Sequence, residues 1–239
     1  INGNDVINQL EMDAKAEGKP VYLRYKPAQD SGKLEFRLEA DDAGAFLRAF
    51  NLYENVKGGK IIVFGEPTAQ GHPNNIKGKA MIDDFMVTNA PTLARLLNAM
   101  TLTGVEELLT QEGITFDRLE SNLNWKISNS GIKFEFRKGR TSGGALGLTF
   151  EGNIHQGQRN EIDINGTIVP ISFINKFISK IPLLGSILTG GENQGIFAAT
   201  YTIKGTSEKT KVSINPLSVL APGIIRRILF EESPDDSDE

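Results

Sequence analysis

The chain has 239 residues, of which 39% are hydrophobic and 23% charged, and its formal net charge is −4. That length and composition suit a folded domain with a sizeable core. The absence of cysteine excludes disulfides, thiolate metal ligands and a cysteine nucleophile, and the lack of a basic excess argues against nucleic acid as a partner.

The acidic residues gather at the C-terminus, where the last nine positions read EESPDDSDE. A charge run of this kind is solvated, so we expect residues 231–239 to form a disordered acidic tail. We expect residues 1–230 to form a single β-rich domain. The chain begins at Ile1, within polar sequence and without a visible signal peptide, which indicates a piece of a longer protein or a processed form.

The N-terminal segment predicts a β-hairpin. Residues 1–19 are polar and have only a weak helical pattern. Apolar and polar residues alternate over 21–26 and again over 33–39, which is the period of strands with one buried face. The turn-forming run PAQDSG joins the two segments, so we expect them to pair with each other.

A helix is predicted directly after this hairpin. Asp41 and Asp42 stand at its start, where an aspartate can cap the first turn. Apolar residues continue at helical spacing as far as Tyr53, and Gly58 and Gly59 lie past the end of the helix.

Two strands and a second helix follow. The strands are expected over 61–64 and 76–87. The helix begins near Ala90, with Pro91 in its first turn, and a further helical turn covers 105–109.

Between residues 114 and 167 the pattern is strand after strand. Leu123 and Trp125 face one way, and Phe134 and Phe136 do likewise on the next strand. The connections SNSG, GRTSGG and HQGQRN have the composition of tight turns. Successive hairpins with one apolar and one polar face predict an antiparallel sheet.

The segment 166–230 completes the chain. It predicts a strand, an apolar helix over 171–188 that is broken at Pro182, a glycine turn, a hairpin and a second apolar helix over 216–230. The expected fold class is mainly β (α+β), an antiparallel sheet of repeated hairpins with a few amphipathic helices covering its end. The same alternation of apolar and polar residues is equally typical of a closed β-sandwich.

Candidate catalytic and metal-binding side chains do not converge in this sequence. His72 and His155, the only histidines, are expected in glycine-rich surface turns and are not at metal-ligand spacing. The pair 41–42 suits a helix cap, and the pair 83–84 lies within a strand, where neighbours point to opposite faces. The glycine-rich loop 185–195 lacks the Lys-Ser/Thr of a nucleotide-binding loop. We therefore predict no catalytic residue, no cofactor, no metal and no enzymatic activity.

The two apolar helices are the candidate functional elements. The window 168–188 is long enough to span a bilayer, but its Asn175, its two lysines and Pro182 argue against a spanning helix. Its apolar stripe either covers one end of the sheet or contacts lipid, as an amphipathic helix with flanking lysines does. The last helix poses the same alternatives. The residues predicted to face lipid or a membrane are Phe173, Ile174, Phe177, Ile178, Ile181, Leu184, Ile187, Leu188, Ile224, Ile225, Ile228, Leu229 and Phe230.

Several long runs of this sequence resemble a known family. The runs GTIVPISFINKFISKIPLLGSILTGG, QGIFAATYTIKG and VSINPLSVLAPGIIRRILF are similar to the C-terminal region of the large AsmA-like proteins of Gram-negative bacteria, in their YhdP-like branch. The upstream pieces DDAGAFLRAF, GGKI, GITFDRLESNLNW and TSGGALGLTFEGNI look like the same region. The resemblance covers roughly residues 35 to 230.

This resemblance implies a curved β-sheet groove with an apolar interior. Such proteins are anchored in the inner membrane by an N-terminal helix, which this chain lacks, and reach across the periplasm. They are thought to carry phospholipid towards the outer membrane and to support its permeability barrier. The implied partners are phospholipid acyl chains and the outer-membrane surface or an envelope protein, and the implied location is the periplasm.

Two alternatives belong to other functional classes. In the first, the domain docks an outer-membrane or envelope protein and carries no lipid. In the second, it is a hydrolase of envelope polymers, which would need a converging acid pair or a nucleophile.

Overall fold

The computed structural model describes residues 7–68, 74–99, 113–143, 146–157, 160–170, 198–206 and 209–217. Within these ranges the chain forms eleven strands and two short helices. The strands are β1 (Leu10–Ala16), β2 (Lys19–Pro27), β3 (Leu34–Ala40), β4 (Val56–Pro67), β5 (Asn75–Val87), β6 (Ile114–Ser128), β7 (Gly131–Ser142), β8 (Leu146–Gly157), β9 (Glu161–Pro170), β10 (Ala198–Thr206) and β11 (Thr210–Leu217). The helices are α1 (Ala43–Ala49) and α2 (Pro91–Ala99).

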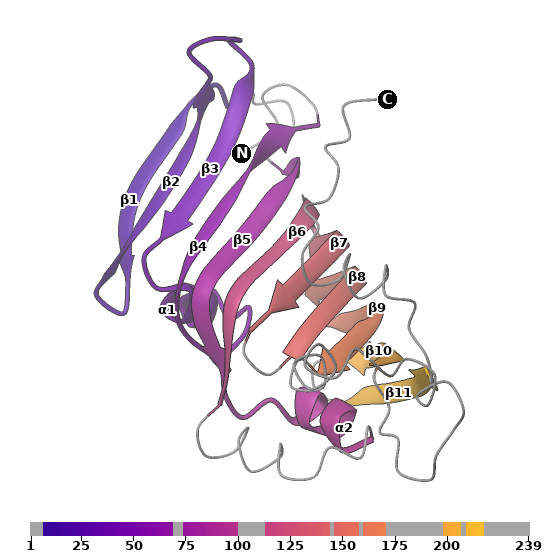
Figure 1. Ribbon diagram of the computed structural model, residues 1–239. Coiled ribbons are helices and arrows are strands. Elements are labelled where there is room, and N and C mark those ends of the chain that lie inside the picture. Colours follow the sequence, from indigo (N-terminus) through magenta and orange to yellow (C-terminus); the bar gives the residue numbers. More distant parts are fainter. Residues whose placement is uncertain are drawn as a thin grey trace, which may run out of the picture.

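All eleven strands belong to one sheet, and their order in the sheet is their order along the chain (Figure 1). Every neighbouring pair is antiparallel. The sheet is open and curved, with α1 inserted between β3 and β4 and α2 between β5 and β6. The predicted fold class, a curved antiparallel sheet of repeated hairpins with few helices, is confirmed.

Both helix starts lie where the sequence predicts them. The Asp42 side chain accepts a hydrogen bond of 2.9 Å from the backbone N–H of Ala45, which is an N-cap. The helix ends earlier than expected, because Phe50 is its C-cap and Tyr53 lies beyond it. Pro91 is the first residue of α2, where its missing N–H costs no hydrogen bond. Neither described helix is long and apolar enough to cross a bilayer.

The N-terminal residues, for which the sequence allowed no firm prediction, form a strand. Residues 10–16 form the edge strand β1 rather than continuing a weak helical pattern. The signal was present, because four apolar residues alternate with three charged ones in LEMDAKA. The alternation does not correspond to a buried and a solvated face, because six of the seven residues of β1 are exposed.

The strand boundaries correct two further predictions. The second apolar helix cannot begin at Pro216, because β11 continues to Leu217. A proline is tolerated there because one side of an edge strand makes no ladder hydrogen bonds. The strand that was expected over 61–64 begins earlier, at Val56, so Gly58 and Gly59 lie inside β4 as well as past the end of α1. Both glycines have positive φ values.

Candidate functional site

One face of the sheet is apolar along its whole width. The strand register places one residue from every strand in a single row across this face, and ten of the eleven are apolar. The row runs Ala14, Val21, Ala40, Ile61, Ile82, Leu119, Thr141, Leu148, Ile168, Ala199 and Pro216. We call this surface the apolar face.

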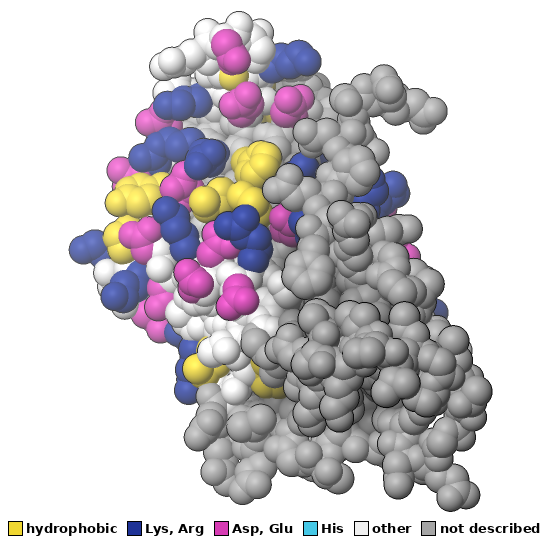
Figure 2. Space-filling model, viewed as in Figure 1, with side chains coloured by type: hydrophobic (Ala, Val, Ile, Leu, Met, Phe, Trp, Pro, Cys, Tyr) yellow, Lys and Arg dark blue, Asp and Glu magenta, His cyan; other side chains and the backbone are white. Residues whose placement is uncertain are grey.

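The opposite face is polar and charged. From β4 to β11 one of its rows reads Glu66, Lys77, Asn124, Glu135, Asn153, Asp163, Lys204 and Lys211. Within it, Lys204 and Asp163 form an ion pair with an N–O distance of 3.1 Å. Figure 2 shows basic and acidic side chains interspersed over the described part of the surface that it views. Water therefore solvates this polar face, while the apolar face requires a cover.

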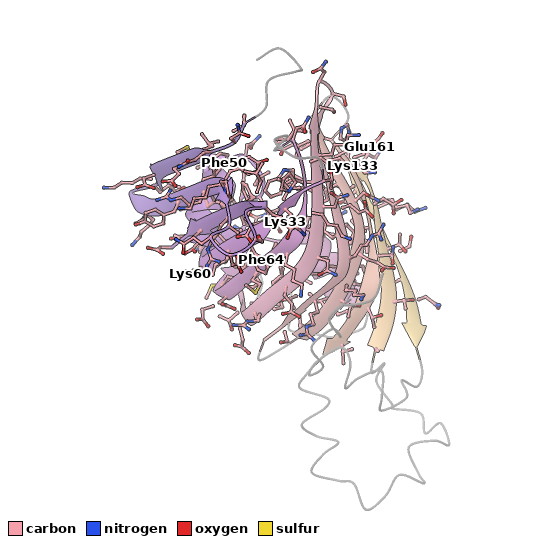
Figure 3. The ribbon with its side chains drawn as sticks, turned by 90° about the horizontal axis from the view of Figure 1, so that it is seen from above. Lys33, Phe50, Lys60, Phe64, Lys133 and Glu161 are labelled. Atoms are coloured by element: carbon pink, nitrogen blue, oxygen red, sulfur yellow. The ribbon has the colours of Figure 1, made fainter. Side chains whose placement is uncertain are left out.

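The apolar face is concave. The rings of Phe36 on β3 and Trp125 on β6 meet edge to face, with centroids 4.6 Å apart, although two strands lie between them. In a flat sheet, strands three positions apart are separated by about 14 Å. The view from above in Figure 3 shows the sheet turning from β1–β3 on one side to β9–β11 on the other. The bend therefore brings apolar side chains of distant strands towards one another.

A glycine pair lies at this bend. Gly65 on β4 is opposite Gly78 on β5, in the row between Phe36 and Leu123. A Cβ atom on Gly78 would lie 1.9 Å from the carbonyl oxygen of Phe64. The two backbones approach so closely here that a side chain on Gly78 would collide with β4, so we infer that the glycines permit the curvature.

The turn that follows α1 contacts β8, and α2 contacts β11. The side chain of Gln156 on β8 donates a hydrogen bond of 2.6 Å to the backbone carbonyl oxygen of Asn51, just after α1. On α2, the hydroxyl oxygen of Thr92 lies 3.4 Å from the hydroxyl oxygen of Thr210, at the start of β11. Arg95 on the same helix donates a hydrogen bond of 3.2 Å to the carbonyl oxygen of Thr210. Gln156 and Thr210 both lie on the apolar face by register. The helices therefore lie on the concave side, and α2 joins the middle of the sheet to its last strand.

Burial divides the apolar face into two sections. Over β2–β5 its large side chains pack against one another, and Tyr25 and Ile76 are 0% and 1% exposed. From β6 to β9 one row of side chains is only half-buried. This row, which we call the half-buried strip, consists of Trp125, Phe134, Ile154 and Ile162. Ile203 on β10 and Val212 on β11, also half-buried, adjoin it.

Two hydrogen-bond donors on the apolar face are buried without a partner among the described residues. They are the phenolic O–H of Tyr25 and the indole Nε1–H of Trp125. Leaving such a group unpaired costs about 1–3 kcal/mol. Burial also raises the pKa of Tyr25, and its phenol is a hydrogen-bond donor at neutral pH even without that shift. The two donors are therefore buried polar groups without a partner among the described residues, on a mainly apolar face.

The residues considered for catalysis have other positions. Asp83 accepts two hydrogen bonds from Arg118, at 2.6 and 3.3 Å, so its carboxylate is ion-paired. The expected alternation fails at its neighbour, because Asp84 has φ 53° and interrupts the regular strand. His155 was predicted in a turn but lies within β8, opposite Lys133. In the described ranges, no three His, Asp or Glu side chains are grouped to hold a metal ion.

The predicted lipid-facing residues lie outside the described residues. This holds for the eight positions from Phe173 to Leu188 and for the five from Ile224 to Phe230. The helical turn 105–109, His72 and the loop 185–195 also lie outside them. The half-buried strip was not among the predicted site residues, although the sequence had placed Trp125 and Phe134 on apolar strand faces.

No family model, curated sequence or solved structure matches this chain.

Proposed function

We propose that this chain is the C-terminal part of an AsmA-like protein of the bacterial periplasm. It binds phospholipid acyl chains on its apolar face and passes them between the inner and outer membranes, without catalysing a reaction. The observation that carries this proposal is the row across eleven strands, apolar at ten of its eleven positions, on the concave side of one sheet. The sequence resemblance over residues 35 to 230 supports the same assignment.

Acyl chains suit this surface for a physical reason. Burying a methylene group gains about 0.8 kcal/mol, so a chain lying on the half-buried strip would gain several kcal/mol without any specific polar contact. Because this gain is non-directional, we expect loose selectivity among lipids of similar chain length. The charged opposite face keeps the sheet soluble while its concave side holds cargo.

The first test is whether the protein carries lipid. We would purify it from the periplasm without detergent, extract it with organic solvent and identify the extract by mass spectrometry. An unrelated β-rich protein prepared in parallel is the control. Phospholipid enriched at a defined stoichiometry is expected, whereas an extract equal to the control would remove the cargo role.

The second test locates the lipid on the sheet. A photo-crosslinking amino acid replaces Phe134, Ile154 or Ile203 on the apolar face. Each of these variants has a matched control at an adjacent residue of the same strand, which lies on the opposite face. These controls are Lys133, which Figure 3 labels, His155 and Lys204. We expect lipid adducts only from the three apolar positions. Protein adducts from these positions, without lipid, would instead favour a docking module for an envelope protein.

A further inference from the structure

The concave side holds a polar feature that acyl-chain binding does not use. Tyr25 lies on β2 and is the register partner of Phe36 on β3. Trp125 lies on β6 with its ring against the same phenylalanine. Phe36 thus neighbours both residues, Tyr25 by strand register and Trp125 by ring contact, and the phenolic O–H and the indole N–H are both buried without a partner among the described residues.

The position of this pair relative to the half-buried strip is informative. Trp125 is both the first residue of the strip and one of the two donors. A chain lying along Phe134, Ile154 and Ile162 would therefore reach Trp125 at one end. Beyond it the apolar face is filled by fully buried side chains such as Ile76, the register partner of Trp125 on β5.

The chemistry of the two groups defines what they can bind. An indole N–H only donates hydrogen bonds, and a protonated phenol donates one strongly. The three other buried polar atoms without a partner among the described residues are amide oxygens of Asn75, Asn124 and Asn153. By register these three belong to the polar face, so the donors are concentrated on the apolar one.

From this arrangement we infer that Tyr25 and Trp125 form a polar subsite that binds the carboxyl-derived oxygen of an amphiphile. That oxygen is the ester carbonyl of a glycerolipid or the carboxylate of a fatty acid. The subsite rests on the proposed function, since it fixes where the polar end of the bound chain lies. It sets the direction of the chain: carbonyl at Trp125, methyl end towards β9.

The experiment uses the single tryptophan of the chain. The delipidated protein, labelled with ¹⁵N, gives one indole N–H signal in an NMR spectrum, which reports hydrogen bonding at Nε1. Three probes are added separately: a lysophospholipid with a hexadecanoyl ester, its hexadecyl ether analogue, which lacks the carbonyl, and palmitate. We expect a downfield shift of the indole proton with the ester or with palmitate, and not with the ether.

Affinity provides the second readout. We expect the ester to bind about five- to tenfold more tightly than the ether, as two neutral hydrogen bonds allow. Tyr25→Phe removes one oxygen atom and should lower this preference while the affinity for the ether is unchanged. Tyr22→Phe, on the polar face of the same strand, is the matched control. It should change neither the preference for the ester nor the affinity for the ether.

Other outcomes separate the two proposals. Equal binding of ester, ether and palmitate, with no shift of the indole proton, would overturn the subsite and leave acyl-chain binding intact. Loss of stability of the lipid-free Tyr25→Phe protein, with unchanged binding, would show that an internal water satisfies the phenol, which also overturns the subsite. If none of the probes binds, both proposals fail.

Discussion

The phenolic O–H of Tyr201 on β10 donates a hydrogen bond of 2.8 Å to the backbone carbonyl oxygen of Thr149 on β8. The strand between them, β9, has Gly166 at the crossing point, as the register partner of Tyr201. A Cβ atom on Gly166 would lie 2.8 Å from the phenolic oxygen. One side chain thus ties three strands together because the middle strand has no side chain there.

Removing that hydroxyl should weaken the C-terminal half of the sheet. We expect Tyr201→Phe to lower the free energy of unfolding by about 1 kcal/mol, because it removes one buried hydrogen bond and leaves the ring in place. Urea unfolding followed by circular dichroism measures the change. Tyr22→Phe, whose side chain is exposed, should have no effect, and an equal loss in both variants would argue against the role of this bond.

Stability should also fall at high pH. Burial raises the pKa values of Tyr201 and Tyr25 above that of an unfolded chain. Above about pH 10 the unfolded chain releases these protons while the folded protein retains them, so the free energy of unfolding decreases as pH rises. Below that pH the two phenols contribute their full stabilisation. Urea unfolding at several pH values from about 8 to 11 should show a shallower decrease in the Tyr25→Phe and Tyr201→Phe double variant.

The glycine pair at the bend should be intolerant of any side chain. Gly78→Ala places a methyl group against the backbone of β4, where no rotamer change can make room, so we expect a loss of about 3 kcal/mol or more. Gly32→Ala is the matched control. Its added Cβ has no heavy atom within 4 Å, and only its positive φ should cost about 1 kcal/mol. Similar losses in the two variants would mean that the bend does not depend on close backbone approach.

The cap of α1 offers a test of local structure. Asp42→Ala removes the side-chain acceptor for the Ala45 N–H and should cost about 1 kcal/mol of unfolding free energy. The side chain of Asp41, one residue earlier, accepts no such hydrogen bond in the described structure. Asp41→Ala should therefore leave the free energy of unfolding almost unchanged. Thermal unfolding of the two variants in parallel checks the difference, and equal effects would contradict the cap assignment.

Local patterns in the sequence were sufficient to locate most of the helices and strands. Alternation located β2 and β3, a proline and an aspartate marked the starts of α2 and α1, and the turn residues defined the meander from β6 to β9. These features depend on neighbours a few residues apart, which a sequence displays directly.

The shape of the apolar face could not be predicted in the same way. That Phe36 lies against Trp125 depends on the register of three strand pairs and on the coincidence of Gly65 with Gly78. Each glycine alone is compatible with a bulge, a turn or a flat strand. The left-handed conformation of Asp84 is likewise set by its place in the sheet, since aspartate in strands is ordinarily extended.

The meander order of the sheet has a consequence for how the molecule assembles. Because each strand pairs with the strands before and after it in the chain, hairpins can form one at a time without waiting for distant segments to meet. The two outermost strands have one paired neighbour each, so amide hydrogen exchange should be fastest at β1 and slow towards β5 and β6. Growth from a central hairpin outwards, as in a solenoid, is the folding route that this connectivity favours.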